Sequence, residues 1–253
     1  MTAPDGTRQQ TAIVTGAAAG VGAEIARALH AAGLRVVATD VDEAGAAALA
    51  KALDQSGETA LSQKLDIAKP KDFQHVLDWT VERWGSVQVL VNNAAMTKAR
   101  PVLEIETEEF NEIMAVNAGG TFSGCRILGR YFKQQGYGRI INMASLAGQN
   151  GGTATGAHYA ASKGAILTLT KVFARDLGPF GVTTNAISPG PMDTPQVRSI
   201  VPEAALPGLI AGIPVGRLGD TGIVAELVAF LASSKSGFVN GACWDVNGGL
   251  FMR

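Results

Sequence analysis

Short runs rich in β-branched residues alternate with longer helical patterns along most of the chain. The strand-like runs are bounded by Gly, Asn or Pro and occupy residues 11–15, 34–38, 87–91, 139–143 and 182–187. Helical spacing fills the intervals, as in Val21, Ile25 and Leu29, which are four residues apart. Strand followed by helix, repeated, predicts parallel strands joined by right-handed crossovers, with helices on both faces. The pattern therefore predicts a doubly wound α/β sheet.

Proline and glycine mark the helix boundaries, and nothing marks a domain boundary. Pro70 suits an early helical position before the helical pattern at 73–84, and Gly85 stands where a C-cap is expected. No Pro/Ser-rich linker, charge run or internal repeat divides the 253 residues. We therefore expect a flexible N-terminus at residues 1–10 and a single domain over residues 11–253.

The composition excludes several classes of function. Lys and Arg total 21 against 22 Asp and Glu, so the chain offers no field that attracts nucleic acid or anionic lipid. No window reaches the roughly 18 uncharged apolar residues of a membrane span. Cys125 and Cys243 lie far apart without CxxC or His spacing, so no metal site is expected. We expect a cytoplasmic protein whose partners are small molecules, with neither nucleic acid nor membrane among them.

A glycine-rich segment joins the first strand-like run to the first helical pattern. Its sequence at 15–22 is TGAAAGVG, with glycines at Gly16, Gly20 and Gly22. Glycine lets the backbone turn sharply and approach a pyrophosphate, with helix amides facing the anion. A turn of small, tightly packed residues is the alternative. Asp40, about twenty positions further on, favours the dinucleotide interpretation because a carboxylate there accepts both ribose hydroxyls of an adenosine.

The same carboxylate indicates which dinucleotide is bound. It would repel a 2′-phosphate, and the nearby Ala19 and Val41 are neutral, while Arg35 lies at the other end of its strand. We therefore expect NAD(H) in preference to NADP(H). Asp66 is placed to meet the adenine edge, the alternative being an N-cap for the helix near Pro70.

A tyrosine and a lysine are spaced for proton transfer. Tyr159 and Lys163 stand four residues apart at the start of a helical run at 160–174, so both emerge on one face. A phenol with its ordinary pKa of about 10 is a poor acid or base near neutrality, and a neighbouring ammonium favours the phenolate. Hydride transfer at a carbonyl carbon requires a proton to move on the oxygen, which Tyr159 would move. Ser145 would hold the same oxygen in line.

Taken together, these motifs resemble the short-chain dehydrogenase/reductase family, in its single-domain branch of about this length. The resemblance runs from Thr11 to Gly249 and rests on TGxxxGxG at 15–22, NNAA at 92–95, Val116-Asn117, Ser145, YAASK at 159–163, Pro189-Gly190 and VNGG at 246–249. It implies a Rossmann-type, seven-stranded parallel sheet and an oxidoreductase that acts on CH–OH groups with NAD or NADP as acceptor.

The resemblance also assigns roles. It implies that Ser145, Tyr159 and Lys163 are catalytic and that Asn117 supports a water chain to the lysine. Ala95 stands where the family more often has Gly, and a proline-stiffened turn is the alternative for Thr194. With the residues argued above, the expected cofactor contacts are Gly16, Ala19, Gly20, Val21, Gly22, Asp40, Val41, Asp66, Ile67, Asn92, Asn93, Ala94, Ala95, Tyr159, Lys163, Pro189, Gly190, Met192 and Thr194.

Two segments break the rhythm of strand and helix and are the candidate substrate loops. One, near 146–158, is rich in Gly, Thr and Ala, and the other, near 189–214, contains six prolines. Irregular segments at the carboxyl ends of parallel strands hold the ligands of such sheets. Arg198 is the single basic residue of the second loop, so a neutral or mostly apolar secondary alcohol or ketone is expected. His158 is interpreted as a loop residue or a wall of the substrate pocket.

Two rival functions remain. The chain also resembles the 3-oxoacyl-[acyl-carrier-protein] reductases of this family, which makes reduction of 3-oxoacyl thioesters of carrier protein or coenzyme A an alternative. Of the two arginines with which those enzymes dock the carrier, one matches Arg175 but the other falls at Gly136, and those enzymes usually prefer NADPH. A non-catalytic NAD(H)-binding regulator is an alternative of another class. The Tyr159–Lys163 pair disfavours it, because a binding module needs no phenol beside an ammonium.

The resemblance also implies self-association. In the family, the helices that carry the matching Asn and Tyr pair across a dyad, and the last strand and helix form a second interface. Four glycines between positions 119 and 129 would permit close helix approach here. A homotetramer is therefore expected.

Overall fold

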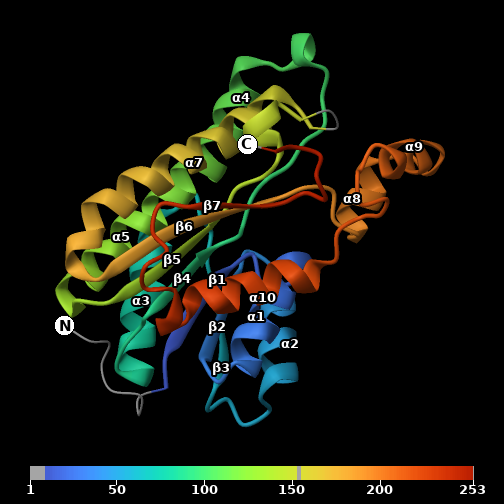
Figure 1. Ribbon diagram of the computed structural model, residues 1–253. Helices are drawn as coiled ribbons and strands as arrows, with labels where there is room; N and C mark the ends of the chain where they lie inside the picture. Colours follow the sequence, from blue (N-terminus) through green and yellow to red (C-terminus); the bar gives the residue numbers. More distant parts are fainter. Residues whose placement is uncertain (1–8, 153–154, 253) are drawn as a thin grey trace.

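The computed structural model describes residues 9–152 and 155–252, so residues 1–8 of the expected flexible N-terminus, and Thr153 of the first loop, lie outside the described residues. The strands are parallel and lie in the order β3-β2-β1-β4-β5-β6-β7, as Figure 1 shows. The prediction of a doubly wound, seven-stranded Rossmann-type sheet is confirmed. The strands are β1 (Thr11–Thr15), β2 (Arg35–Asp40), β3 (Ala60–Lys64), β4 (Val89–Asn92), β5 (Gly138–Met143), β6 (Val182–Pro189) and β7 (Cys243–Val246).

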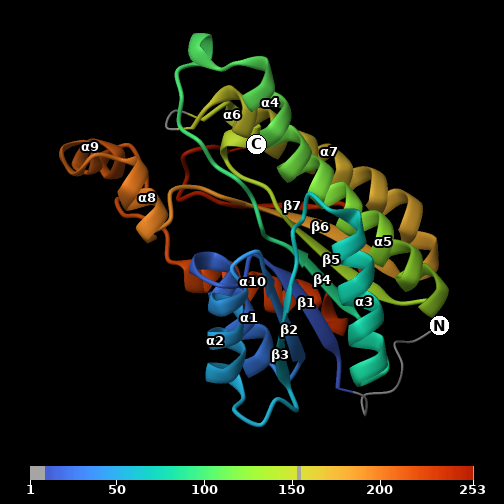
Figure 2. The same cartoon turned by 180° about the vertical axis from the view of Figure 1, so that it is seen from behind.

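Helices cover both faces of the sheet. Helices α1, α2 and α10 lie on one face and α3, α5 and α7 on the other, while α8 and α9 project from the body (Figures 1 and 2). No helix in the described part of the chain is both long and apolar enough to cross a bilayer. The helices are α1 (Gly20–Ala31), α2 (Glu43–Leu53), α3 (Pro70–Trp84), α4 (Thr107–Met114), α5 (Gly120–Gln135), α6 (Ala147–Asn150), α7 (Ala157–Leu177), α8 (Pro195–Ile200), α9 (Leu206–Ala211) and α10 (Thr221–Ala232).

The central strands are buried because both of their faces are covered by helices. All five residues of β1 and all six of β5 are buried. Side chains of a strand alternate between the two faces, so Val14 packs in the cluster formed with α1 and α10. Ile13, its neighbour, packs instead in the cluster formed with α3 and α5. The continuous apolar runs in the sequence are the consequence.

The two edge strands carry a weaker pattern than the central ones. β3 has one buried residue of five, and β7 has none among its four. An edge strand that is half solvated reads as a mixed polar segment, so the apolar runs indicated only the strands between them.

The expected irregular loops contain short helices, which corrects that prediction. The first loop holds α6 and the start of α7, and the second holds α8 and α9. Prolines of the second loop stand in the first turns of α8 and α9, where proline is tolerated because the first-turn amides have no intrahelical partner. Helix α7 also begins earlier than the run at 160–174, and Tyr159 therefore lies in its first turn.

A buried arginine bonds backbone carbonyls at the amino ends of β5 and β6, away from the expected site. Arg139 of β5 is only 4% exposed. Its guanidinium donates to the carbonyl of Gly138 at 2.9 Å and to those of Gly181 and Ser233 at 3.3 Å. It also lies 4.3 Å from the ring centroid of Tyr137. One side chain thus ties β5 to the start of β6 and to the end of α10.

Candidate active site

The glycine segment forms a closed turn between β1 and α1. Gly16 has φ +67°, and a Cβ there would lie 2.8 Å from the Cα of Ala94. A Cβ on Gly22 would collide with the carbonyl oxygen of Gly16. The amide of Asn93 holds the turn by donating to the carbonyls of Thr15 and Gly16, at 3.0 Å each. Glycine is required here for conformation at one position and for space at the other.

Asp40 ends β2 beside this turn. One carboxylate oxygen accepts from the Ala18 amide at 3.0 Å and the other from the Asp42 amide at 3.0 Å. These two bonds fix the carboxylate at the carboxyl end of the strand, where an adenosine ribose is expected.

One cavity, of about 830 Å³, joins the glycine turn to the expected catalytic residues. It is lined by every expected cofactor contact except Asn92, and by three of the four expected catalytic residues. Residues at or just beyond the carboxyl ends of β1 to β6 meet here, because the carboxyl ends of parallel strands share one edge of the sheet.

Asn92 and Asn117 lie outside the lining. Asn92 is 5% exposed, and its amide donates to Asn142 Oδ1 at 2.9 Å, between β4 and β5. Asn117 is fully buried within a π-helical stretch, Ala115–Gly119, that separates α4 from α5. Its side chain accepts from the Met96 amide at 2.7 Å and donates to the Met96 carbonyl at 2.9 Å. Asn92 thus joins side chains of two strands, whereas Asn117 braces the Met96 backbone beside the cavity. Single-turn π-bulges of this kind are frequent at functional sites.

Tyr159, Ser145 and Lys163 come together at one end of the cavity. The Lys163 ammonium donates to the Met143 carbonyl at 2.7 Å and lies 5.6 Å from the Tyr159 ring centroid. Burial lowers the pKa of Lys163 to about 8. Burial also raises the pKa of the Tyr159 phenol, against the opposing effect of hydrogen bonds with Ser145 and Thr97. The expected depression of this phenol's pKa by Lys163 is not found: the pKa is raised by burial, and the effects that oppose burial come from Ser145 and Thr97.

Thr97 is a contact that the motifs did not indicate. It lines the cavity, and its side chain hydrogen-bonds the Tyr159 phenol. The segment that carries it follows the NNAA motif directly, and that position was the signal available in the sequence. Met96, Val116 and Val197 also line the cavity and add apolar surface.

Two expected cofactor contacts, Thr194 and Asp66, also accept hydrogen bonds from backbone amides close by in the sequence, and a third residue, His158, lies inside a helix. Thr194 is the N-cap of α8 and accepts from the Val197 amide at 3.2 Å, so its hydroxyl both caps a helix and lines the cavity. Asp66 accepts from the Ala68 amide at 3.0 Å, in a turn before α3 whose N-cap is Lys69. His158 lies within α7, fully buried and outside the cavity lining, so its interpretation as a loop residue is wrong.

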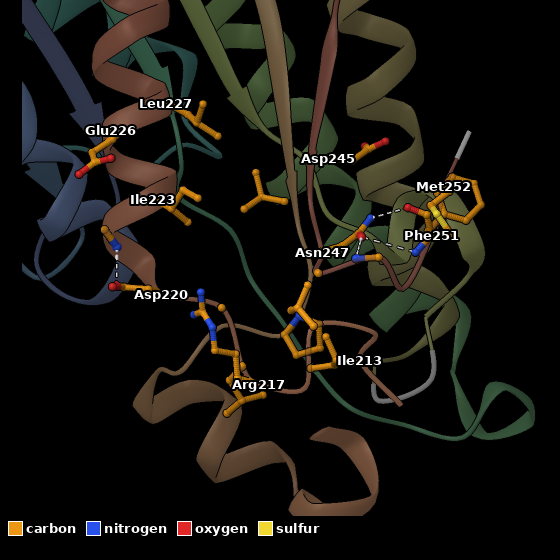
Figure 3. A pocket seen from close by; sticks show the side chains of 18 residues that line it. Ile213, Arg217, Asp220, Ile223, Glu226, Leu227, Asp245, Asn247, Phe251 and Met252 are labelled. Carbon is orange, nitrogen blue, oxygen red and sulfur yellow. Dashed lines mark hydrogen bonds between the residues drawn. The ribbon is translucent and has the colours of Figure 1, made fainter. Parts of the chain in front are cut away.

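A second cavity, of about 880 Å³, lies between α10, the 213–219 segment, and the end of β7 with the residues that follow it (Figure 3). Helix α10 contributes Ile223 and Leu227, and the C-terminal segment contributes Phe251 and Met252. Asn247 holds this segment by donating to the Phe251 carbonyl at 3.0 Å. No expected site residue lines this cavity.

The first cavity fits a nicotinamide dinucleotide. Helix α1 begins at Gly20, and amides of a first helical turn have no intrahelical partner and favour an anion. At Gly20, with φ +58°, nothing lies within 4 Å of where a Cβ would be, so the backbone of the turn is open to such an anion on that side. Asp40 supplies an acceptor for a ribose diol. By contrast, no group of three His, Cys, Asp or Glu side chains among the described residues could hold a metal ion.

Comparison with known proteins identifies one matching family model and several similar enzymes. The family model described as "Enoyl-(Acyl carrier protein) reductase" matches residues 16–251. The chain is 34% identical over 243 residues to "3-oxoacyl-[acyl-carrier-protein] reductase FabG" of Escherichia coli (strain K12), covering 95% of this chain and 97% of the relative. It is 37% identical over 246 residues to "4-formylbenzenesulfonate dehydrogenase TsaC1/TsaC2" of Comamonas testosteroni, with coverage of 95% and 97%. "Short-chain reductase protein NovJ" of Streptomyces niveus is 34% identical over 249 residues, with coverage of 96% and 94%.

The fold and its cavity define a nicotinamide-dependent oxidoreductase that acts on CH–OH groups. The chain belongs to the short-chain dehydrogenase/reductase family, as the near-complete coverage of the family model and of these relatives shows.

Proposed function

We propose that the protein transfers a hydride between NAD(H) and a secondary alcohol or ketone, with Tyr159 as the acid or base. The observation that carries this proposal is the meeting of Tyr159, Ser145 and Lys163 in the cavity that the glycine turn lines. A bound nicotinamide supplies or accepts the hydride, and the side chains of the chain handle the proton.

Each side chain has a separate task at the substrate oxygen. The Tyr159 phenol, whose pKa burial raises, is protonated near neutral pH and donates to the carbonyl oxygen during reduction. Ser145 hydrogen-bonds the same oxygen and holds it near the phenol. Lys163, with a pKa of about 8, is largely charged at neutral pH and stabilises negative charge that develops nearby.

The preference for NAD(H) is part of this proposal and rests on Asp40. Its fixed carboxylate would meet a 2′-phosphate, and Arg35 stacks on Trp84 at the other end of β2, 5.7 Å from the ring centroid. Lys64 of β3 is the register partner of Asp40, but it lies outside the cavity lining. We expect kcat/KM to be higher with NADH than with NADPH, and Asp40→Ala to lower the NADH value about tenfold. Equal or better turnover with NADPH would overturn the preference.

A neutral substrate follows from how the nearby charges are paired. Arg198 of the second loop donates to both carboxylate oxygens of Asp193, at 2.8 and 3.0 Å. Its charge is thereby balanced, which supports a neutral or mostly apolar carbonyl compound. An NADH-absorbance screen of ketones, cyclic and aromatic alcohols, sugars and 3-oxoacyl thioesters tests this inference.

Reduction of 3-oxoacyl thioesters is the second candidate, favoured by the relatives that bear that name. Arg175, the position that matches one carrier-docking arginine, is exposed and paired with Asp176 at 2.9 Å. Gly136, the other position, ends α5 with φ +70°, a conformation that disfavours an arginine. A 3-oxoacyl thioester as the best substrate in the screen would select this candidate.

Tyr159→Phe tests catalysis against the alternative of a non-catalytic NAD(H)-binding regulator. The variant should bind NADH as the parent does, and its kcat should fall by a factor of about 10² to 10⁴ because the proton carrier is lost. Binding is followed by NADH fluorescence and turnover by NADH absorbance. Unchanged turnover would overturn the assignment of Tyr159.

A homotetramer and a cytoplasmic location complete the proposal. Phe122 of α5 and Val172 of α7 are 43% and 39% exposed, and the rings of Phe122 and Phe173 lie 6.0 Å apart. The exposed apolar side chains of α5 and α7 support association through the first expected interface, and the second cavity, lined by α10 and the end of β7, lies where the family implies the second (Figure 3). Light scattering should give four chains per particle, and a monomer would contradict the proposal. Cell fractionation tests the location.

A further inference from the structure

A fully buried histidine precedes Tyr159 and has no part in the proposed proton transfer. His158 stands in the first turn of α7 and is 0% exposed. It faces Glu109, which lies 49 residues earlier, on α4. A buried polar ring of this kind needs partners for both nitrogens.

The hydrogen bonds of His158 fix its tautomer. The Tyr159 amide donates to His158 Nδ1 at 2.8 Å, so Nδ1 carries no proton. The proton is therefore on Nε2, which donates to Glu109 Oε1 at 3.1 Å. A first-turn amide such as that of Tyr159 has no intrahelical partner, and the N-cap residue Gly156 provides no side-chain cap. His158 supplies the missing acceptor.

The backbone around the ring leaves space for it. A Cβ on Gly156 would collide with the imidazole, and Gly156 has φ −73°, which any residue adopts. Glycine is needed at this position for the space that the ring occupies. The Gly156 amide also donates to the Lys98 carbonyl at 3.3 Å, which joins the start of α7 to the segment that carries Thr97.

Glu109 is held as a carboxylate by several donors. Arg100 Nε donates to Oε1 at 2.8 Å, and Lys98 Nζ lies 3.9 Å from Oε2. The Arg100 hydrogen bond, followed by that of His158, lowers the pKa of Glu109. The acceptor that orients His158 is thus ionised and itself oriented.

The carbonyl of Tyr159 is held by a second relay. Ser162 Oγ donates to the Tyr159 carbonyl at 2.7 Å, and Asn117 Nδ2 donates to Ser162 Oγ at 3.0 Å. Side chains therefore fix the backbone of Tyr159 at its amide and at its carbonyl. The amide relay runs through His158 to Glu109.

We propose that His158 and Glu109 are a pair of positioning residues that orient Tyr159 for proton transfer. The inference rests on the proposed function, in which Tyr159 moves the proton. A small displacement of a reacting group costs a large factor in rate, so loss of this relay should lower kcat more than it affects cofactor binding.

The tautomer can be measured directly on the wild-type protein. The chain has 3 histidines, His30, His75 and His158, so 15N-histidine labelling gives few signals to assign. We expect His158 to show the neutral Nε2–H tautomer near neutral pH, with Nδ1 accepting a hydrogen bond. A neutral Nδ1–H tautomer, or an imidazolium, would overturn the proposal. This readout is independent of catalysis.

Variants test the consequence for the rate. His158→Ala should lower kcat about tenfold with the KM for NADH unchanged. His158→Asn, whose amide oxygen can accept from the Tyr159 amide, should recover part of that loss. His75→Ala, on the exposed face of α3, is the matched control and should have the parental kcat.

A double-variant cycle tests whether the two residues act together. Glu109→Ala and His158→Ala should each lower kcat, and the double variant should be no slower than the slower single variant. Glu112→Ala is the control. Glu112 lies on the same helix as Glu109, and its carboxylate is 2.8 Å from the Lys98 ammonium. Parental kcat in His158→Ala, or fully additive losses, would overturn the pairing.

The outcomes separate this inference from the proposed function. Tyr159→Phe that retains turnover overturns the proposed function, whatever the tautomer of His158. Loss of turnover in Tyr159→Phe, with parental kcat in His158→Ala, overturns only the positioning role. If His158→Ala fails to fold, the tautomer in the intact protein decides the matter.

Discussion

Two buried cations contact opposite ends of strand β5 in different ways. Lys163 is 3% exposed and donates to the carbonyl of Met143, the last residue of β5. Arg139 is 4% exposed and stands second in the same strand, where it donates to three carbonyls and lies over the Tyr137 ring. Burial lowers the pKa of both side chains.

The two cations serve different purposes: Arg139 contributes to stability, and Lys163 lies where it can contribute to catalysis. Arg139 keeps its charge, because the ordinary pKa of a guanidinium lies far above neutral pH, and its planar fork matches several carbonyls at once. Lys163 has three donors, of which Met143 takes one, and its pKa of about 8 lies near working pH. The cation at the amino end of β5 thus stabilises the fold. The cation at the carboxyl end is buried beside the candidate active site and lowers the stability of the fold.

The largest effect is expected from Lys163→Met. Removal of the ammonium beside Tyr159 should lower kcat by a factor of about 10² to 10⁴, as for other losses in acid–base machinery. The melting temperature should stay the same or rise, because the variant no longer buries a charge. NADH turnover and a thermal melt measure the two effects.

Lys171→Met, on the exposed face of the same helix, is the matched control for this loss. It removes the same charge from α7 away from the cavity, and its kcat should equal that of the parent. A lower melting temperature in Lys163→Met, with kcat retained, would mean that Lys163 stabilises the fold, as Arg139 does, and has no role in catalysis.

The next effect concerns the pH dependence of stability. Between about pH 8 and pH 10.5, folded Lys163 has lost its proton while the unfolded chain still holds it. The unfolded state then binds more protons, so the free energy of unfolding rises with pH in this window, by about 3 kcal/mol in total. We expect the stability gap between Lys163→Met and the parent to close by that amount, as measured by urea unfolding at several pH values.

Cys125 must be separated from this effect. Burial raises the pKa of its thiol from 9.0 to about 12, so its contribution to stability falls as pH rises above 9. The contribution is present in both the parent and Lys163→Met, and it cancels in their difference. A gap that does not change with pH would mean that Lys163 is as readily charged in the folded chain as in the unfolded one.

Much of the fold could be predicted because the central strands are buried on both faces. Such strands are continuous apolar runs, and the spacing of Tyr159 and Lys163 marks one helix face. Strands β3 and β7 lie at the edges, where half of each strand is solvated, so their pattern is weak. Local patterns indicate local structure, and the expectation of a seven-stranded Rossmann-type sheet came from the family resemblance; the order of its strands is given by the structure.

The remainder of the site depends on contacts that no spacing encodes. Glu109 meets His158 across 49 residues, and Asn117 holds Met96 across 21. Arg139 bonds the carbonyl of Ser233, which lies 94 residues away. Each of these contacts joins segments that are far apart in the sequence and meet only in the tertiary structure, so residue types and periodicity carried no signal for them.

A smaller effect, on stability alone, is expected from Arg139→Met. The carbonyls of Gly138, Gly181 and Ser233 lose their buried donor, which should cost about 2 kcal/mol. For a chain of this length the melting temperature should fall by about 4 to 8 °C. The kcat of the folded protein should not change, since the side chain lies at the amino end of β5. A loss of kcat at full stability would contradict the separation of the two ends.

The smallest effect at neutral pH, and the sharpest distinction, is expected from Arg139→Lys. An ammonium keeps donors for part of the carbonyl set but lacks the planar fork, so we expect a loss of about 1 kcal/mol. Burial at this position already lowers the pKa of an arginine, and it would lower that of a lysine below 10.5 in the same way. The variant should then be stabilised relative to the parent as the pH rises toward 10.5, because its unfolded chain binds more protons there. Urea unfolding from pH 7 to 10.5 measures this. If the difference in the free energy of unfolding does not change with pH, the carbonyls around position 139 stabilise an ammonium as well as water does. The low pKa of Lys163 would then reflect its few hydrogen-bond partners rather than its burial.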